Sequence, residues 1–301
     1  MIIRSRAPLR LGLAGGGTDV SPYCDLHGGA VLNVTIDLYA YATIEPQAQG
    51  VCFVAADLQR RLDADPETAA TIAEPLALHR AVYRRMVAEY NGGQPLPCRI
   101  TTFCDAPPGS GLGTSSTMVV ALVTAFAEWL NLPLGEYEIA RLAFEIERLD
   151  AGFGGGRQDQ YAATFGGVNF IEFHPEERVI VNPLRVKDWI VSELETSLVL
   201  FDSGTSRQSA AIIAEQTRNL TSRAGTTLEA MHALKKDAFA MKEALLKGDF
   251  ERLAACMRQG WEAKKQLASS ITNTHIDTIV EAALEAGAQA GRVSGAGGGG
   301  F

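Results

Sequence analysis

The spacing of hydrophobic positions changes along the chain and predicts mixed strands and helices in its first half and mostly helices in its second. Short runs rich in Val, Ile, Thr and Tyr predict strands at 2–5, 9–14, 30–37, 38–45, 51–55, 99–103, 167–173, 197–201 and 290–294. Apolar residues three or four positions apart predict helices at 75–90, 114–130, 135–149, 158–164, 206–222, 226–247, 250–269 and 275–286. This order predicts an α+β fold, with a mixed N-terminal domain at 1–185 and a helix-rich C-terminal domain at 186–301.

The composition of the chain argues against several classes of protein. The 301 residues are 47% hydrophobic and 21% charged, enough for a large core and two lobes. The formal charge of −8 disfavours nucleic-acid binding, and no apolar run approaches the ~20 residues of a membrane span. The first six residues lack the apolar core of a signal peptide, and five cysteines without a close pair predict a reduced, cytoplasmic protein without a zinc site. A homo-oligomer stays open, since the helical second half could supply an interface.

A glycine-rich segment between the predicted strand at 99–103 and the apolar helix at 114–130 gives the strongest local signal. Its alternating glycines allow backbone N–H groups to turn toward an anion, and its hydroxyls fall where a helix begins. A glycine turn with a Ser or Thr cap would need no ligand, but three hydroxyls exceed what capping requires. The segment is neither a Walker A loop nor the fingerprint of a nicotinamide-dependent oxidoreductase. We therefore expect phosphate to bind Pro108, Gly109, Ser110, Gly111, Leu112, Gly113, Thr114, Ser115 and Ser116.

Two acidic residues downstream are the candidates for chemistry on a bound phosphate. Asp159 follows a glycine-rich bend, and Glu147 lies twelve residues earlier, at the border of the apolar stripe of its helix. Phosphoryl transfer needs positioning, charge neutralisation and often a base for the attacking hydroxyl. The alternatives are a helix cap for Asp159 and a solvated boundary position for Glu147.

The glycine-rich loop resembles the ATP-binding signature of the GHMP kinase superfamily, which includes galactokinase, homoserine kinase and mevalonate kinase. Thr114 and Ser116 are its two conservative departures from that signature. The resemblance implies ATP and Mg²⁺, with Ser115 as a metal ligand. It also implies an N-terminal lobe like domain 2 of ribosomal protein S5 and a ferredoxin-like, helix-rich C-terminal lobe.

Two further segments resemble motifs of this superfamily. Residues 7–19 resemble its N-terminal motif, which implies that Arg10 faces the catalytic site and that the sugar binds Gly16, Gly17, Thr18 and Asp19. Glycines replace the usual Glu-His pair of that motif. Residues 293–301 resemble its C-terminal glycine signature, which implies a substrate pocket at Gly297 and Gly298. Family members usually continue with another strand and helix, so we expect an incomplete C-terminal domain here.

The resemblance also assigns roles to the acidic pair. Galactokinase-like members carry Met-Asp-Gln with a Glu twelve residues before the Asp, and the spacing here is identical, with Gln158 in place of Met. This implies that Asp159 is the catalytic base, that Arg10 supports it with positive charge, and that Glu147 is the second Mg²⁺ ligand.

Within the superfamily, residues 15–19 and 156–163 most resemble bacterial D-glycero-D-manno-heptose 7-phosphate kinases, and the resemblance runs from Arg6 to Gly300. Those kinases phosphorylate the C1 hydroxyl to give a 1,7-bisphosphate for GDP-heptose and surface polysaccharide synthesis. The sugar phosphate would then contact Gly156, and its phosphate would bind Arg207 after Thr205 and Ser206, or else Arg157. Two alternatives stay open: a fucokinase-, galactokinase- or mevalonate kinase-like enzyme, and a non-catalytic binding module on the same fold.

Overall fold

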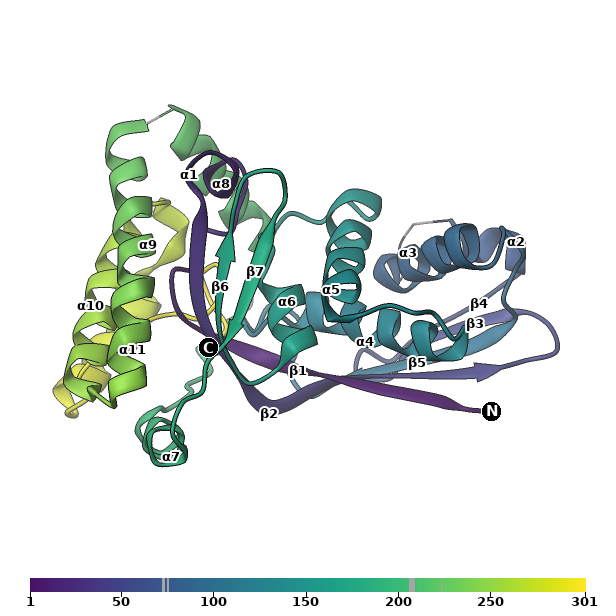
Figure 1. Ribbon diagram of the computed structural model, residues 1–301, viewed down its shortest axis with the longest axis horizontal. Helices are drawn as coiled ribbons and strands as arrows, with labels where there is room; N and C mark the ends of the chain where they lie inside the picture. Colours follow the sequence, from purple (N-terminus) through teal and green to yellow (C-terminus); the bar gives the residue numbers. More distant parts are fainter. Residues whose placement is uncertain (72–73, 75, 206–208, 223) are drawn as a thin grey trace.

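The computed structural model describes residues 1–71, 74, 76–205, 209–222 and 224–301, so the predicted site residue Arg207 lies outside the described residues. Two lobes are joined by a pair of long strands, β1 (Ile3–Ala14) and β2 (Gly29–Pro46), which run from one lobe into the other (Figure 1). Among the described residues, no helix combines the length and apolarity needed to cross a bilayer.

Seven strands form one sheet, in which β2 is the central member. The others are β3 (Val51–Ala55), β4 (Arg60–Ala64), β5 (Cys98–Cys104), β6 (Val168–Phe173) and β7 (Val179–Pro183). Their order is β4-β3-β5-β2-β6-β7, with β1 paired to β2. The first half of β2 pairs with β6 and its second half with β5. Strands β3 and β5 are parallel, and the other pairs of described strands are antiparallel. Strand β2 therefore connects the β4-β3-β5 part of the sheet with the β6-β7 part.

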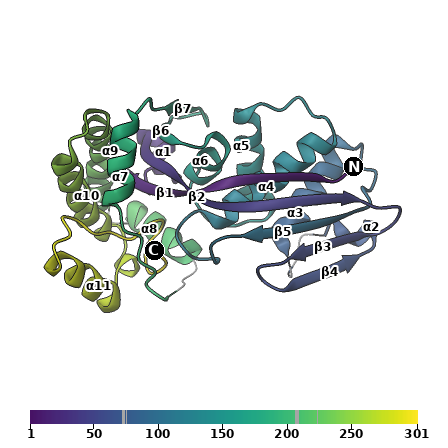
Figure 2. The same cartoon turned by 90° about the horizontal axis from the view of Figure 1, so that it is seen from below.

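Helices cover one face of this sheet in the N-terminal lobe, as the two perpendicular views show (Figures 1 and 2). They are α2 (Pro66–Ala69), α3 (Ala77–Arg85), α4 (Thr114–Trp129), α5 (Glu136–Phe144) and α6 (Gln158–Phe165). The short helix α1 (Tyr23–His27) lies apart from them, near β6 and the helices of the C-terminal lobe. Two π-helical turns, η1 (Met86–Tyr90) and η2 (Glu145–Asp150), extend α3 and α5. Helix α4 packs on β1 and β2, which explains why its sequence is apolar on nearly every side.

The C-terminal lobe is built from helices. They are α7 (Asp188–Ser197), α8 (Ser209–Ser222), α9 (Ala224–Lys247), α10 (Phe250–Lys265), the short 3₁₀ turn η3 (Ser269–Ile271) and α11 (Thr274–Glu285). Helices α9 and α10 pack on each other, and α9 also packs on β1 and β2. A mixed N-terminal lobe and a helix-rich C-terminal lobe confirm the predicted α+β class. The predicted domain boundary falls between β7 and α7 and stays a prediction.

Several predicted elements differ from the structure. The runs at 30–37 and 38–45 form one strand, as do those at 2–5 and 9–14, while β4 and β7 were not predicted. The predicted strands at 197–201 and 290–294 are wrong. Residue 197 ends α7, and the residues from 198 to 203 and from 290 to 293 have no regular structure. A strand requires a neighbour for its backbone hydrogen bonds, and no described strand pairs with either segment, although Val199 and Phe201 have strand-forming side chains.

Candidate active site

One cavity collects most of the predicted site residues. Its volume is about 170 Å³, and it is partly open to solvent. Its walls come from the turn after β1, the loop before α4, the turn before α6, helices α8 and α10, and the C-terminal glycine segment. The residues used below are Arg10, Gly17, Asp19, Gly109, Gly111, Gly113, Thr114, Ser115, Ser116, Arg148, Gly156, Gln158, Asp159, Gln216, Lys264, Gly295 and Ala296.

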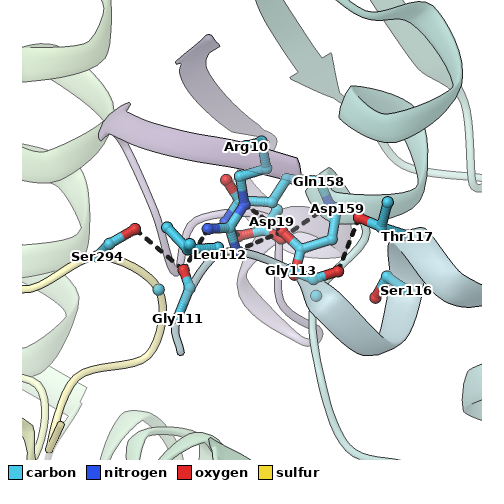
Figure 3. A network of polar contacts seen from close by, with 12 residues as sticks. Arg10, Asp19, Gly111, Leu112, Gly113, Ser116, Thr117, Gln158, Asp159 and Ser294 are labelled. Atoms are coloured by element: carbon cyan, nitrogen blue, oxygen red, sulfur yellow. Dashed lines mark hydrogen bonds and ion pairs between the residues drawn. The ribbon is translucent and has the colours of Figure 1, made fainter. Parts of the chain in front are cut away.

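The buried side chain of Arg10 joins the loop to α6. Its Nε donates to Asp159 Oδ1 at 2.7 Å, its Nη2 lies 2.6 Å from the same oxygen, and its Nη1 donates to the Gly111 carbonyl oxygen at 2.6 Å (Figure 3). No described residue donates a hydrogen bond to Asp159 Oδ2, so that oxygen is available in the cavity. The carboxylate is therefore not a helix cap: the N-cap of α6 is Arg157.

The loop before α4 is close enough to Asp159 to share a ligand with it. Gly113 has a φ of +80°, and a Cβ on this residue would lie 3.3 Å from Asp159 Cγ. Gly113 is also the N-cap of α4, and no side chain caps this helix. The first N–H groups of α4 are therefore left for a ligand at the positive end of the helix, as a phosphate-binding loop requires.

Glu147 is fully buried in the π-helical turn η2, where it meets the hydroxyl of Ser115. Ser115 Oγ donates to Glu147 Oε1 at 2.5 Å, and Gln160 Nε2 donates to Oε2 at 2.7 Å. Arg148 Nη1 lies 3.1 Å from Glu147 Oε1. Carboxylate and hydroxyl oxygens are of the donor type that Mg²⁺ prefers. Within the described ranges, no group of three or more His, Cys, Asp or Glu could hold a metal ion.

Asp19 lies on the other side of Asp159, and its carboxylate is almost completely buried. It accepts hydrogen bonds from the backbone N–H of Gly17 and of Gln158, both at 3.1 Å. Burial raises the pKa of Asp19, the Gln158 N–H opposes that shift, and the charge of Asp159 adds to it. A Cβ at Gly156 would lie only 1.9 Å from Asp19 Oδ2, so glycine is required there.

Other predicted site residues lie behind the cavity wall. Thr18 donates to the carbonyl oxygens of Gly15 and Ala30 and holds the turn after β1. The N–H of Gly298 donates to the Ile271 carbonyl oxygen, so Gly295 and Ala296, rather than the predicted Gly297 and Gly298, line the cavity. The described residues that line the cavity also do not include Gly16, Ser110 or Leu112.

Arg157 points away from the cavity. Its Nη2 lies 3.4 Å from Asp25 Oδ1 and 3.9 Å from Glu177 Oε1, and its guanidinium lies over the ring of Phe144. The described lining does not include it.

Sequence reasoning missed a buried cation in this site. Lys264 of α10 is 2% exposed, and its Nζ donates to the Gly295 carbonyl oxygen at 2.5 Å. Burial, followed by the charges of Arg292 and Arg10, lowers the pKa of Lys264 to about 7. The sequence contains a pattern that could have predicted its burial, because Lys264 lies at helical spacing from Leu253 and Gly260, on the buried face of α10.

The geometry brings together the groups that phosphoryl transfer needs. A helix start with uncapped N–H groups, a carboxylate with a free oxygen and an adjacent guanidinium line one cavity. Ser115 lines it as well, whereas its partner Glu147 is fully buried and does not belong to the lining.

Comparisons with known proteins agree with this arrangement. The family model "GHMP kinases N terminal domain" matches residues 77–167, and the model "GHMP kinases C terminal" matches residues 241–301. The chain is 47% identical over 300 residues to D-glycero-alpha-D-manno-heptose 7-phosphate kinase of Campylobacter jejuni, covering 99% of this chain and 88% of that protein.

Solved structures give the same result. A crystal structure of a D-glycero-D-manno-heptose 1-phosphate kinase from Bacteroides thetaiotaomicron matches with a TM-score of 0.82 and 47% identity, over 99% of this chain and 86% of that one. A mevalonate kinase structure matches with a TM-score of 0.73 at 19% identity, over 100% of this chain and 89% of that one, which shows the fold alone. Both domain models and a relative of this identity over almost the whole chain show that this protein belongs to the GHMP kinase family, as its motifs predicted.

Proposed function

We propose that this kinase transfers the γ-phosphoryl group of ATP to the C1 hydroxyl of D-glycero-D-manno-heptose 7-phosphate. The observation that carries the proposal is the contact of Arg10 with Asp159 at 2.6 Å, in a cavity shared with the glycine-rich loop. The substrate class follows the names of the two relatives, both of which specify a manno-heptose phosphate, although one name places the phosphate at C7 and the other at C1.

In the proposed reaction, the chain supplies a proton acceptor and a positive environment. Asp159 takes the proton of the C1 hydroxyl on its free Oδ2, while Arg10 fixes Oδ1 and orients the carboxylate. The C1 oxygen forms a bond to the γ-phosphorus as the bond from that phosphorus to the β,γ-bridging oxygen breaks, and ADP leaves. Backbone N–H groups of the loop and of the first turn of α4 stabilise the charge on the transferred group.

Ser115 and Glu147 would hold Mg²⁺. Their oxygens are already adjacent, and both belong to the hard donors that this ion selects, so the donor set fits. When bound, the ion neutralises charge on the nucleotide phosphates. In the absence of the ion, Arg148 supplies the positive charge beside Glu147.

Asp19 would bind hydroxyls of the sugar, because it is the acidic side chain that lines the cavity beside Asp159. Arg207, which precedes α8, would contact the phosphate of the acceptor. A cytoplasmic location suits a kinase that consumes ATP, and all five cysteines are free. The product would enter GDP-heptose synthesis for surface polysaccharide.

An ADP-release assay with heptose 7-phosphate, galactose, fucose and mevalonate tests the proposal. We expect the highest kcat/KM with heptose 7-phosphate. Asp159→Asn should lower kcat by about 10²- to 10⁴-fold, the usual range for a general base, with little change in ATP affinity. Asp63→Asn is the matched control, since Asp63 is an exposed residue of β4 paired with Arg61.

Three outcomes would contradict the proposal. Higher kcat/KM with fucose, galactose or mevalonate would assign another GHMP kinase activity. ATP binding without turnover of any acceptor would favour a binding module. Full activity of Asp159→Asn would remove the proposed base.

A further inference from the structure

An acceptor that carries its own phosphate needs a cation with free hydrogen-bond donors in the cavity. Among the described lining residues, the basic side chains are Arg10, Arg148 and Lys264. The question is which of these three has donors left for a second phosphate.

The two arginines are held by protein acceptors. Nε and Nη2 of Arg10 contact Asp159, and its Nη1 donates to the Gly111 carbonyl oxygen. Arg148 contacts Glu147 and the hydroxyl of Ser116, and three backbone carbonyl oxygens between residues 153 and 156 accept from its guanidinium. Both guanidinium groups therefore serve mainly to hold the catalytic carboxylates and the turn before α6.

Lys264 differs from both arginines. An ammonium group has three donors, and within the described part of the chain Nζ of Lys264 makes one hydrogen bond, to the Gly295 carbonyl oxygen. No carboxylate of a described residue lies within the 4 Å limit for an ion pair with it. A buried cation without a counter-ion is unfavourable, so its environment favours an incoming anion.

Two amide side chains lie near Lys264, around the glycine turn after β1. Nζ of Lys264 lies 3.6 Å, and Nε2 of Gln158 3.7 Å, from the position that a Cβ on Gly16 would occupy. Oε1 of Gln216 lies 3.8 Å from the corresponding position on Gly17. The bare backbone of this turn therefore lets a lysine and two amide side chains approach it closely. All three side chains line the cavity next to Asp19.

We propose that Lys264 recognises the phosphate already present on the acceptor, with the amide groups of Gln216 and Gln158 beside it. The inference rests on the proposed function, which it deepens by naming a described residue, in addition to the proposed Arg207, that selects a phosphorylated sugar. The charged groups that face Lys264 are Arg292, Arg10, Asp19 and Asp159. A phosphate dianion at this position stabilises the protonated lysine, so binding near pH 8 takes up a proton.

The test compares Lys264→Met with the wild type on two acceptors, heptose 7-phosphate and unphosphorylated heptose. Methionine keeps the length of the side chain and removes the charge. We expect the preference for heptose 7-phosphate, expressed as the ratio of the two kcat/KM values, to fall about 10- to 100-fold, as for loss of a charged hydrogen bond. KM for ATP should stay within about twofold.

Lys265→Met is the matched control, because Lys265 is the next residue of α10 and its Nζ pairs with Glu262 at 2.8 Å. It should keep the wild-type preference. A second readout separates recognition from packing: calorimetry of heptose 7-phosphate binding at pH 8, in two buffers of different ionisation enthalpy. The wild type and Lys265→Met should take up a proton, whereas Lys264→Met should take up less.

Each other outcome overturns a specific statement. If the wild type prefers heptose 7-phosphate and Lys264→Met retains that preference, Lys264 does not recognise the phosphate. Equal losses on both acceptors would place Lys264 at the reacting hydroxyl or in the framework, and would also overturn the inference. If the wild type does not turn over heptose 7-phosphate, or does not prefer it to heptose, the proposed substrate is wrong, and the inference that rests on it fails as well.

Discussion

Two glycines determine where the carboxylates of the cavity can lie. Gly113 leaves room for Asp159 beside the loop, and Gly156 leaves room for both oxygens of Asp19 in the turn before α6. The closer approach is at Gly156, where a methyl group would overlap Asp19 Oδ2. At the scale of single residues, the absence of a side chain is therefore as important to this site as the charged groups.

The first prediction concerns Gly156→Ala. The added Cβ must displace the Asp19 carboxylate, so kcat/KM for the acceptor should fall at least about tenfold, or ~1.4 kcal/mol, while ATP affinity changes little. Steady-state kinetics with each substrate varied separately measure this. Gly225→Ala in α9 is the control, because a Cβ there meets nothing within 4 Å. An unchanged acceptor KM and kcat in Gly156→Ala would show that Asp19 does not bind the acceptor.

At the scale of elements, α10 carries a charge on its buried face. Its pattern of buried residues is that of an ordinary amphipathic helix up to Lys264, which interrupts it. A buried charge without a counter-ion lowers the stability of the folded state unless a bound ligand supplies the opposite charge. Natural proteins keep such destabilising groups mainly at functional sites. The stability of α10 against the rest of the lobe should therefore depend on the protonation of this one residue.

We predict that Lys264→Met stabilises the protein in a pH-dependent way. The pKa of Lys264 is about 7 in the folded protein, whereas an exposed lysine, as in the unfolded chain, has a pKa of 10.5. Between these two pH values the folded state therefore binds fewer protons than the unfolded state. The wild type therefore gains stability as pH rises from about 7 toward 10.5, and the penalty that methionine removes is largest at or below pH 7. We expect a gain of about 2–4 kcal/mol at pH 6.5 and a smaller gain at pH 9.5, measured by urea unfolding.

The same substitution at Lys265 is the control for stability. That residue is partly exposed and paired with Glu262, so its replacement should change the free energy of unfolding by less than about 0.5 kcal/mol at either pH. A gain for Lys264→Met that is equal at both pH values, or a loss of stability, would contradict the buried-cation interpretation.

At the scale of the whole molecule, the cavity exists only because two lobes meet. The glycine-rich loop before α4 and Asp159 belong to the N-terminal lobe, whereas Gln216 and Lys264 belong to helices of the C-terminal lobe. The C-terminal glycine segment closes against the loop: Ser294 Oγ donates to the Gly111 carbonyl oxygen at 3.0 Å (Figure 3). A bound ligand should therefore stabilise both lobes together.

We predict that saturating Mg-ATP raises the midpoint of thermal unfolding. At about 100 times its dissociation constant, a ligand adds about 2.7 kcal/mol, or roughly 4 °C for a chain of this size. Differential scanning calorimetry measures the shift, with adenosine at the same concentration as the control without phosphates. A similar shift with adenosine would mean that the loop before α4 does not bind the phosphates.

The sequence predicted those parts of this protein that depend on local pattern. The apolar spacing of α4, the glycines and hydroxyls before it, and the twelve-residue separation of Glu147 and Asp159 are properties of contiguous chain. They were sufficient for the α+β class and for the superfamily.

Pairing between distant segments was not predictable in the same way. β4 and β7 are strands because β3 and β6 offer them backbone partners, and the apolar run at Val199–Leu200–Phe201 is not a strand because no described strand pairs with it. Lys264 is a site residue only because α10 packs behind the turn after β1, about 250 residues away in sequence. Local periodicity reports which face of a segment is buried, but the partners of that face, and the charge that they bring to the cavity, are decided by tertiary packing.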